Sequence, residues 1–469
     1  MDQGFNQMDH ARLQNRIAGK VIYRDHPDYQ NVWKENWNQL RPERYPDLII
    51  QVSSDLDVVE AVKFARENRL NVAVRGGGHA WCATPLRKGG MLIDLSRLVE
   101  VKIDPVTRTA AIQPFISNQE LMRKLEAHQL AFPVGHCPQV KASGYLLSGG
   151  IAWNASMWGH ATLSVTAVEM VTAEGRLVTA NAHQNHEMFW AARGAGAGMF
   201  AVVTRFHLKL YSRPPAIHTS TYYYPLSNLR KVAEWFSDAV ETMPRNVEMT
   251  LFLVSAPADL IDQCRSDGGK ICMITATVFA DTKEEAVQTL SVLERCPYNP
   301  ACLRKTVAEA VTFEDLFALS GGMWPEFHRN KVESLWSNSR PSDILCAVRD
   351  HFIKTPNPKT IVLFALYPGW VNGVPPEHDL ALSKAARVYG GPWTMWEDAK
   401  DDTANIGWHR KCCEILKPFA SGRYLGESDI IDDPSRAEQA FSPSNWQRLQ
   451  QLKTKYDPAG LFHGFFGGL

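Results

Sequence analysis

The chain has 469 residues, 45% of them hydrophobic and 21% charged, and its formal net charge is zero. This length predicts two domains, and the neutral balance favours neither a nucleic acid nor a membrane as partner. No apolar run has transmembrane length, and the polar first ten residues contain no signal-peptide core, so we expect a cytoplasmic protein. Nine cysteines without zinc-like or disulfide-like spacing predict free thiols and no metal site.

The first elements form a strand–helix–strand unit. Residues 46–52 are apolar enough for a short buried strand, and Ser54 followed by Asp57 has the spacing of a capping box that opens a helix. Residues 71–75 predict the next strand. This strand leads directly into three consecutive glycines and a histidine.

The glycine loop comprises Gly76, Gly77 and Gly78 and is followed by His79. Adjacent glycines permit positive φ and a close approach of backbone N–H groups to an anion. The glycine spacing of a dinucleotide-binding Rossmann turn and the lysine of a P-loop are both missing. Taken alone, the loop is therefore either a ligand cradle or a structural hairpin that carries a surface histidine.

The next segments continue the mixed pattern. Ser117 followed by Glu120 predicts a second helix start, and the inner face of this helix would carry Leu121, Leu125 and His128. Apolar runs and alternation predict strands over residues 91–95, 109–113 and 202–210, and a hairpin over residues 168–177.

A composition change at Arg213-Pro214-Pro215 predicts a domain boundary. We expect a first domain over residues 1–213, an α+β second domain over 214–420, and a return to the first domain over 421–469. In the second domain His328, Arg329 and Lys331 either meet an anionic or polar substrate or form a solvated face. Its tryptophans are expected to be core residues rather than a substrate platform: Trp324, Trp336, Trp370, Trp393 and Trp396.

Several motifs, in order, resemble one flavoprotein family. These are residues 73–79 with 90–98, residues 135–138 with the glycines after them, residues 169–176 with 189–204, and the closing residues 446–462. They closely resemble the FAD-binding domain of the vanillyl-alcohol oxidase and para-cresol methylhydroxylase superfamily, and most of all its berberine bridge enzyme-like branch. The resemblance implies an α+β fold, in which a PCMH-type FAD-binding domain of two α/β subdomains carries an inserted α+β substrate-binding domain.

The resemblance also implies the cofactor and its attachment. FAD would be bonded covalently through His79 and, as in part of the family, also through Cys137, because imidazole and thiolate are competent nucleophiles. For Cys137 the alternative is a small buried thiol. Further FAD-binding residues implied by the match are Arg75, Gly76, Gly77, Gly78, Ala80, Gly144, Gly149, Gly150 and Val202. The polar flavin contacts around Ile151-Ala152-Trp153-Asn154 and Leu163-Ser164 depart from the family pattern.

The implied activity is removal of a hydride from a C–OH or C–N centre of a small organic molecule, with molecular oxygen as electron acceptor. The family's Tyr-x-Asn-Tyr pattern beside the flavin is altered here: Tyr424 matches, but Gly426 and Glu427 replace the other two residues. Tyr424 is the expected flavin-facing residue and a catalytic candidate, either a ring-packing residue or a phenolic acid/base. Glu427 is either a buried general base or a solvated loop acid. Two other functions stay open: a carbohydrate (oligosaccharide) oxidase, and a flavin-binding protein without turnover.

Overall fold

The computed structural model describes residues 7–368 and 379–465, so the expectation for Trp370 lies outside the described residues. The first sheet has the strand order β1-β2-β4-β3, with β2 and β3 parallel to β4. Its strands are β1 (Lys20–Tyr23), β2 (Leu48–Gln51), β3 (Val72–Arg75) and β4 (Met91–Asp94). The predicted strand–helix–strand unit is confirmed.

Helix α3 (Asp55–Glu67) joins β2 to β3 and begins where the sequence predicts. The Ser54 side chain accepts a hydrogen bond from the Asp57 N–H at 3.2 Å, which satisfies one of the free donors of the first turn. The Asp57 carboxylate does not return to Ser54. It accepts from the backbone N–H groups of Ala18, Gly19 and Ser53 instead, so that it ties the start of α3 to the segment before β1.

The second sheet is antiparallel and has the order β5-β6-β10-β8-β9. Its strands are β5 (Val101–Asp104), β6 (Thr109–Ile112), β8 (Val165–Thr172), β9 (Leu177–Asn181) and β10 (Ala201–Lys209). Helices that pack around it include α4 (Asn118–Glu126), α5 (Ala142–Leu147), α7 (His186–Ala192) and, from the end of the chain, α14 (Pro443–Tyr456). The predicted hairpin is confirmed as β8–β9. His128 lies beyond the end of α4 and is exposed, so its predicted inward position is wrong.

The third sheet is the largest, with the order β15-β12-β14-β13-β18-β19-β17-β20 and β16 beside β19. Its long strands are β12 (Ala216–Pro225), β13 (Val247–Ser255), β14 (Lys270–Ala280), β15 (Arg304–Ala310), β18 (Ile361–Leu366) and β19 (Val388–Trp396). The short ones are β16 (Arg329–Val332), β17 (Leu335–Ser337) and β20 (Gly422–Arg423). The α+β fold is thus as predicted, and the exact domain boundaries stay a prediction.

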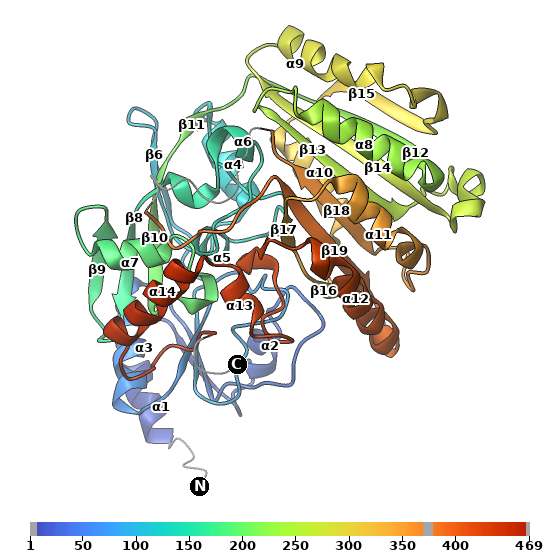
Figure 1. Cartoon of the computed structure of the whole chain (residues 1–469). Helices are drawn as coiled ribbons and strands as arrows, with labels where there is room; N and C mark the ends of the chain where they lie inside the picture. Colours follow the sequence, from blue (N-terminus) through green and yellow to red (C-terminus); the bar gives the residue numbers. More distant parts are fainter. Residues whose placement is uncertain (1–6, 369–378, 466–469) are drawn as a thin grey trace.

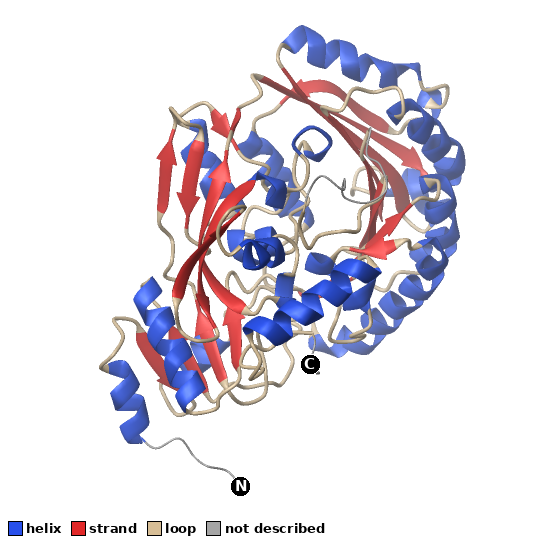
Figure 2. Cartoon of the chain, turned by 60° about the vertical axis from the view of Figure 1, so that its left-hand side comes forward, coloured by secondary structure: helices blue, strands red, loops and turns tan. Residues whose placement is uncertain are grey.

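One face of the large sheet is covered by helices, which form the outer edge of the molecule in Figure 2. They are α8 (Leu229–Val240), α9 (Lys283–Leu290), α11 (Pro341–Ile353) and α12 (Asp402–Leu416). The other face looks toward the first two sheets. Because side chains alternate along a strand, Met249, Leu251 and Leu253 of β13 pack under the helices, while Phe252 belongs to a separate cluster on the inner face.

The C-terminal segment connects these parts. After α12 it adds β20 to the large sheet and then runs back along the second sheet through α13 (Arg436–Gln439) and α14, as the red ribbon in Figure 1 shows. Phe462 forms a bridge with Val72 of the first sheet. No helix within the described ranges is long and apolar enough to cross a membrane.

The charged residues of β16 do not form a solvated face. Arg329 forms an ion pair with Asp402 at 2.5 Å, Lys331 pairs with Asp429, and His328 is buried. The carboxylates of Asp402 and Asp429, from distant segments, neutralise these two cations, so the cations need not be hydrated.

The predicted core role holds for only part of the tryptophans. Trp336, Trp393 and Trp396 are buried as predicted. Trp324 and Trp393, however, also line the main cavity. A core role therefore describes only part of this set.

Candidate active site

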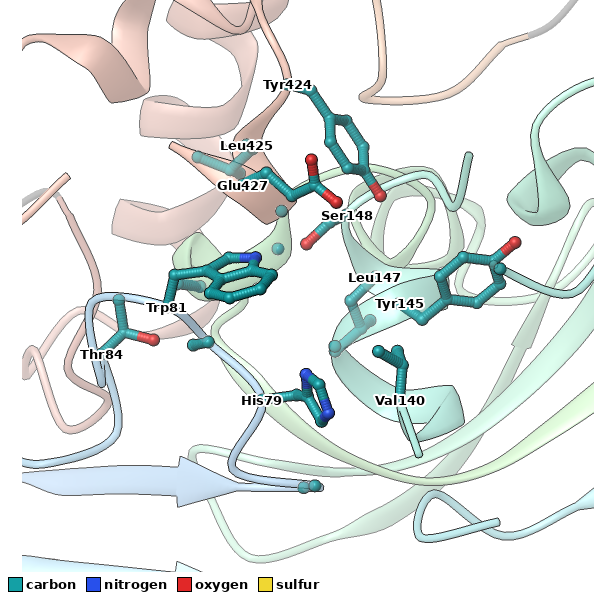
Figure 3. A pocket seen from close by; sticks show the side chains of 18 of the residues that line it. His79, Trp81, Thr84, Val140, Tyr145, Leu147, Ser148, Tyr424, Leu425 and Glu427 are labelled. Carbon is teal, nitrogen blue, oxygen red and sulfur yellow. The ribbon is translucent and has the colours of Figure 1, made fainter. Parts of the chain in front are cut away.

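The main cavity lies between the inner face of the large sheet and the first two sheets, and its volume is about 330 Å³, within the range of ligand pockets. Residues of all three sheets, of α5 and of the C-terminal segment line it. Figure 3 shows how His79 and Trp81 approach from the loop after β3, while Tyr424 and Glu427 approach from the C-terminal segment.

The glycine loop lines this cavity and has steric reasons for its composition. A Cβ on Gly76 would lie 1.7 Å from Ser143 Oγ, and one on Gly77 would lie 2.2 Å from Lys141 Cγ. Gly78 has φ +65°, and a Cβ there would lie 2.6 Å from the Glu35 carbonyl oxygen. The glycines therefore let the loop pack closely on its neighbours, and the same close packing turns its backbone toward the cavity.

His79 lies at the end of that loop and is held by rings. Its imidazole stacks on Trp37, with centroids 4.8 Å apart, and lies edge-on to Trp81 at 6.4 Å. Burial, followed by the Lys141 charge, lowers the pKa of His79 to about 3, so the ring is neutral at physiological pH. Its Nε2 has no hydrogen-bond partner among the described residues. The interpretation as a surface histidine is wrong.

Cys137 also lines the cavity, in the loop between β7 (Leu130–Ala131) and α5. The loop is fixed by Asn118, whose side-chain amide donates to the Cys137 carbonyl oxygen at 3.1 Å. Burial, and then the nearby Glu427 charge, raise the pKa of the Cys137 thiol to about 12. The thiol is therefore protonated in the protein as it stands, and reaction as a thiolate requires a change in its surroundings.

Glycines within α5 and in the turn after it shape this part of the cavity. Gly144 lines it directly, whereas Gly149 and Gly150 have φ of +114° and +75° and follow the helix. A Cβ on Gly150 would lie 2.7 Å from the Ala161 Cβ. The Gly150 N–H donates to the Tyr424 hydroxyl at 3.1 Å, so this turn fixes the tyrosine of the C-terminal segment.

Glu427 faces the same cavity from the C-terminal segment. Burial raises the pKa of its carboxyl to about 7, although a hydrogen bond donated by the Tyr389 hydroxyl and the charge of His136 act in the opposite direction. The interpretation of Glu427 as a solvated loop acid is therefore wrong. A carboxyl that titrates near neutrality within a cavity is suited to proton transfer.

The wall opposite the glycine loop was missed by the sequence reasoning. Three strands of the large sheet supply it: Glu248, Thr250 and Phe252 from β13, Leu363 and Ala365 from β18 with Tyr367 directly after it, and Tyr389 and Trp393 from β19. The only available signal was the period of two along residues 248–252. That signal does not tell which face of the strand is inward.

The sequence-predicted site residues separate into two sets. The cavity is lined by His79, Cys137, Tyr424, Glu427, Gly76, Gly77, Gly78, Ala80 and Gly144. Four others do not line it. Arg75 is buried in an ion pair with Asp94, and Val202 packs in the core of the first sheet while its neighbours Ala201 and Val203 line the cavity. Gly149 lies against Leu382, and Gly150 lies against Ala161 and Tyr145.

The residues of the cavity fit FAD. Arg87 lines it, is 5% exposed, and has two guanidinium nitrogens, Nε and Nη1, without partners in the described part of the chain. A buried cation of this kind needs an anion, and a diphosphate would supply one. The neutral imidazole of His79, whose Nε2 has no hydrogen-bond partner in the described part of the chain, and the apolar walls suit a planar ring. No cluster of three or more His, Cys, Asp or Glu among residues 7–368 and 379–465 is placed to hold a metal ion.

Two family models that match this sequence identify the class of protein. The family model described as an FAD binding domain matches residues 46–181, and the model described as berberine and berberine-like matches residues 424–464. These two segments contribute His79, Cys137, Tyr424 and Glu427 to the one cavity. The fold and the site are therefore those of an FAD-binding PCMH-type domain that is completed by a berberine-type C-terminal segment.

The chain belongs to the berberine bridge enzyme-like FAD-linked oxidoreductases. It is 26% identical over 448 residues to the FAD-linked oxidoreductase nodO of Hypoxylon pulicicidum, which covers 95% of this chain and 96% of that protein. It is also 25% identical to a xylooligosaccharide oxidase of Thermothelomyces thermophilus, over 89% of this chain and 86% of that one. These relatives favour an enzyme over a flavin-binding protein without turnover.

Solved structures confirm the fold. The structure of 6-hydroxy-D-nicotine oxidase from Arthrobacter nicotinovorans superposes with a TM-score of 0.82 at 21% identity, covering 96% of this chain and 97% of that one. Berberine bridge enzyme from Eschscholzia californica gives a TM-score of 0.80 at 17% identity, with 98% of each chain covered.

Proposed function

We propose that this oxidoreductase removes a hydride from a C–OH or C–N centre of a small organic molecule, with FAD bonded covalently through His79 and Cys137. The observation that carries the proposal is the convergence of His79, Cys137 and Glu427 on one cavity from three distant parts of the chain. Molecular oxygen is the proposed electron acceptor, and hydrogen peroxide the expected product.

The cofactor would be held by residues of the FAD-binding part of the chain. The glycine loop and Arg87 would bind its diphosphate, and His79 and Cys137 would fix its ring. Bound FAD supplies the hydride acceptor. The protein's own part is to orient the substrate and to exclude water, since the walls from β13, β18 and β19 are largely apolar and aromatic.

Glu427 is the proposed general base. Loss of a hydride from an alcohol or amine carbon requires removal of the O–H or N–H proton, and a carboxyl with a pKa of about 7 can accept it at neutral pH. Tyr389 donates a hydrogen bond to this carboxylate and so keeps it ionised more readily. The Tyr424 hydroxyl accepts a hydrogen bond from the Gly150 N–H. Tyr424 would therefore keep the C-terminal segment in a fixed position beside the flavin ring.

A second candidate function is the oxidation of an oligosaccharide. The likeness to xylooligosaccharide oxidase favours it, and so does the presence of Trp324 and Trp393 on the cavity wall. Reduction of the flavin by cellobiose or xylobiose, but not by a panel of aromatic alcohols and amines, would select this function.

The covalent attachment is tested on a denaturing gel. We expect flavin fluorescence to stay with the unfolded protein, to remain after His79→Ala or Cys137→Ala alone, and to disappear in the double variant. Cys82→Ala is the matched control, because Cys82 is another thiol on the cavity wall. Release of all flavin from the unaltered protein on denaturation would contradict the proposal.

A further inference from the structure

The segment over residues 35–39 packs against the glycine loop and follows helix α2 (Tyr29–Trp33). The Trp37 N–H donates to the Gly78 carbonyl oxygen at 3.0 Å, and a Cβ on Gly78 would lie 2.6 Å from the Glu35 carbonyl oxygen. Trp37 does not belong to the residues that line the cavity. The glycine loop is therefore held by a segment that the proposed chemistry does not use.

The Trp37 indole supports the imidazole of His79. The two rings are stacked, with centroids 4.8 Å apart and planes 25° apart. Trp81, which Figure 3 shows beside His79, is nearly perpendicular to both rings, at 4.9 Å from Trp37 and 6.4 Å from His79. His79 Nε2 has no hydrogen-bond partner within the described ranges, so no hydrogen bond at that atom sets the orientation of the ring. The packing of the two indoles sets it instead.

Asn38 holds Trp37 in its place. It is 1% exposed, and its side-chain amide donates to the carbonyl oxygens of Trp81 at 2.5 Å and of Asn330 at 2.9 Å. Its Oδ1 accepts from the N–H groups of Asn330 at 2.8 Å and of Leu40 at 3.0 Å. Every polar group of this buried side chain is thus satisfied, and a shift of the segment would break these bonds. Trp37 is therefore a fixed surface against which His79 packs.

We propose that Trp37 is the positioning residue for attachment of the flavin to His79. The indole covers one face of the imidazole, so rotation of the imidazole about its Cβ–Cγ bond would drive the ring into the indole. One orientation of His79 is thereby favoured before the cofactor binds. The inference rests on the proposed function, because it concerns the covalent bond that this function assigns to His79.

Formation of that bond needs an oriented nucleophile. One C–H bond of the flavin 8α methyl group and the N–H bond of the imidazole break, and a C–N bond forms. The two electrons and two protons that are released reduce molecular oxygen to hydrogen peroxide, so the attached flavin ends in its oxidised state. The nitrogen must point at the methyl carbon in this step, and an enforced orientation of the reacting groups accelerates a reaction. Burial keeps His79 neutral, and the stack on Trp37 gives it direction.

The test measures how fast the bond to His79 forms. The parent is full-length Cys137→Ala protein from riboflavin-starved cells, in which His79 is the attachment residue that remains. It is mixed with saturating FAD in air, and attached flavin is followed by fluorescence on denaturing gels. Trp37→Leu keeps apolar bulk without a ring face and should slow attachment about fivefold or more, because the fraction of correctly oriented imidazoles falls by the strength of one ring pair. Trp37→Phe keeps a ring and should stay within about twofold of the parent. Equal rates in Trp37→Leu and the parent would overturn the proposal.

A matched control separates the stack on His79 from the packing of the segment. Trp33 stacks on Tyr45 with nearly the same geometry, 4.7 Å between centroids and 25° between planes. Trp33→Leu should therefore attach flavin at the rate of the parent. A rate as slow as that of Trp37→Leu would overturn the proposal, because disturbed packing near the loop would then explain both variants.

Affinity for FAD distinguishes positioning from a purely structural role. In protein that carries both His79→Ala and Cys137→Ala, the addition of Trp37→Leu should leave the affinity for FAD unchanged in a fluorescence titration. A weaker affinity would show that Trp37 shapes the cofactor site itself and would overturn its assignment as a positioning residue. If the Cys137→Ala parent attaches no flavin, the proposed function is wrong at His79 and this inference is wrong with it, an outcome distinct from equal rates.

Discussion

At the scale of single residues, the chemistry of the site depends on burial more than on residue type. The same low-dielectric surroundings lower the pKa of His79 to about 3 and raise that of Glu427 to about 7. The histidine is thereby kept neutral and able to act as a nucleophile. The glutamate is brought to the pH at which it can both accept and release a proton.

Glu427→Gln tests the proposed base. Because the carboxylate form is the active one, kcat/KM should rise with pH through about 7 and level off above it. The variant should lose this limb of the profile and about 10²- to 10⁴-fold in kcat/KM, the usual contribution of a general base. Stopped-flow flavin reduction from about pH 5 to about pH 9, a range that brackets this pKa, measures the pH limb and the loss of rate. A limb retained in the variant would assign the titration to another group.

Tyr389→Phe tests the hydrogen bond to Glu427. The Tyr389 hydroxyl stabilises the charged carboxylate, so its removal should move the midpoint of the pH profile upward by roughly one pH unit, the equivalent of one such bond. Tyr222→Phe is the control, since it removes a hydrogen bond to Glu294 under the outer helices. An unchanged midpoint in Tyr389→Phe would mean that this bond does not tune the base.

At the scale of elements, short segments hold each functional loop by backbone hydrogen bonds. Helix α3 and strand β1 are joined through Asp57, and the turn after α5 is joined to the C-terminal segment through Gly150 and Tyr424. These hydrogen bonds fix the position of each loop relative to the element that it joins. The glycine loop, which follows the strand after α3, depends on this arrangement.

Asp57→Ala should destabilise the first sheet. It leaves the N–H groups of Ala18, Gly19 and Ser53 without an acceptor, at a cost of about 2–3 kcal/mol. Burial raises the pKa of Asp57, but these hydrogen bonds outweigh it and the net pKa is lowered. Its stabilisation is therefore present above the unfolded pKa, about 4, and is lost as the pH falls through the folded value.

Urea unfolding at neutral and at acid pH measures both effects. The difference between Asp57→Ala and the unaltered protein should shrink on acidification. The exposed Asp25, in the same region of the chain, provides Asp25→Ala as a control that should change neither. A difference that is independent of pH would show that the ionised carboxylate is not the stabilising group.

At the scale of the whole molecule, the site exists only where two halves of the chain meet. The C-terminal segment is held against the large sheet by the buried Glu333. This carboxylate accepts from Arg423 at 3.1 Å and from the Asp429 N–H at 3.2 Å, and forms an ion pair with Arg436 at 2.6 Å. Its three partners flank Tyr424 and Glu427, so Glu333 fixes the position of the proposed base.

Glu333→Ala should therefore lower both stability and rate. Removing one partner of a buried ion pair costs about 3–5 kcal/mol, because the arginines keep their charge without a counter-charge. We expect a lower thermal-unfolding midpoint together with a reduced kcat, and partial recovery in Glu333→Gln, which keeps an acceptor. If the midpoint falls while kcat and the pH profile are unchanged, Glu333 stabilises the fold without positioning Glu427.

Sequence patterns over short distances predicted much of this protein. The helix start at Ser54 and the strands around the glycine loop are encoded by residues a few positions apart, because capping, alternation and φ freedom are local properties. The attachment candidates His79 and Cys137 were implied by the resemblance to the flavoprotein family. The family motifs then predicted the α+β fold and FAD.

Only the tertiary structure decided which groups share the cavity and what their charge states are. The Tyr389 hydroxyl forms a hydrogen bond with Glu427, and His136 forms one with Glu248, 112 positions away in the sequence. No local sequence pattern predicts such contacts. The burial of Glu427, the pairing of Lys331 and the inward face of β13 follow from the packing of the large sheet on the first two. Sequence alone therefore determined the elements and the cofactor, whereas packing determined the pKa values and the wall that faces the substrate, since both depend on contacts between distant segments.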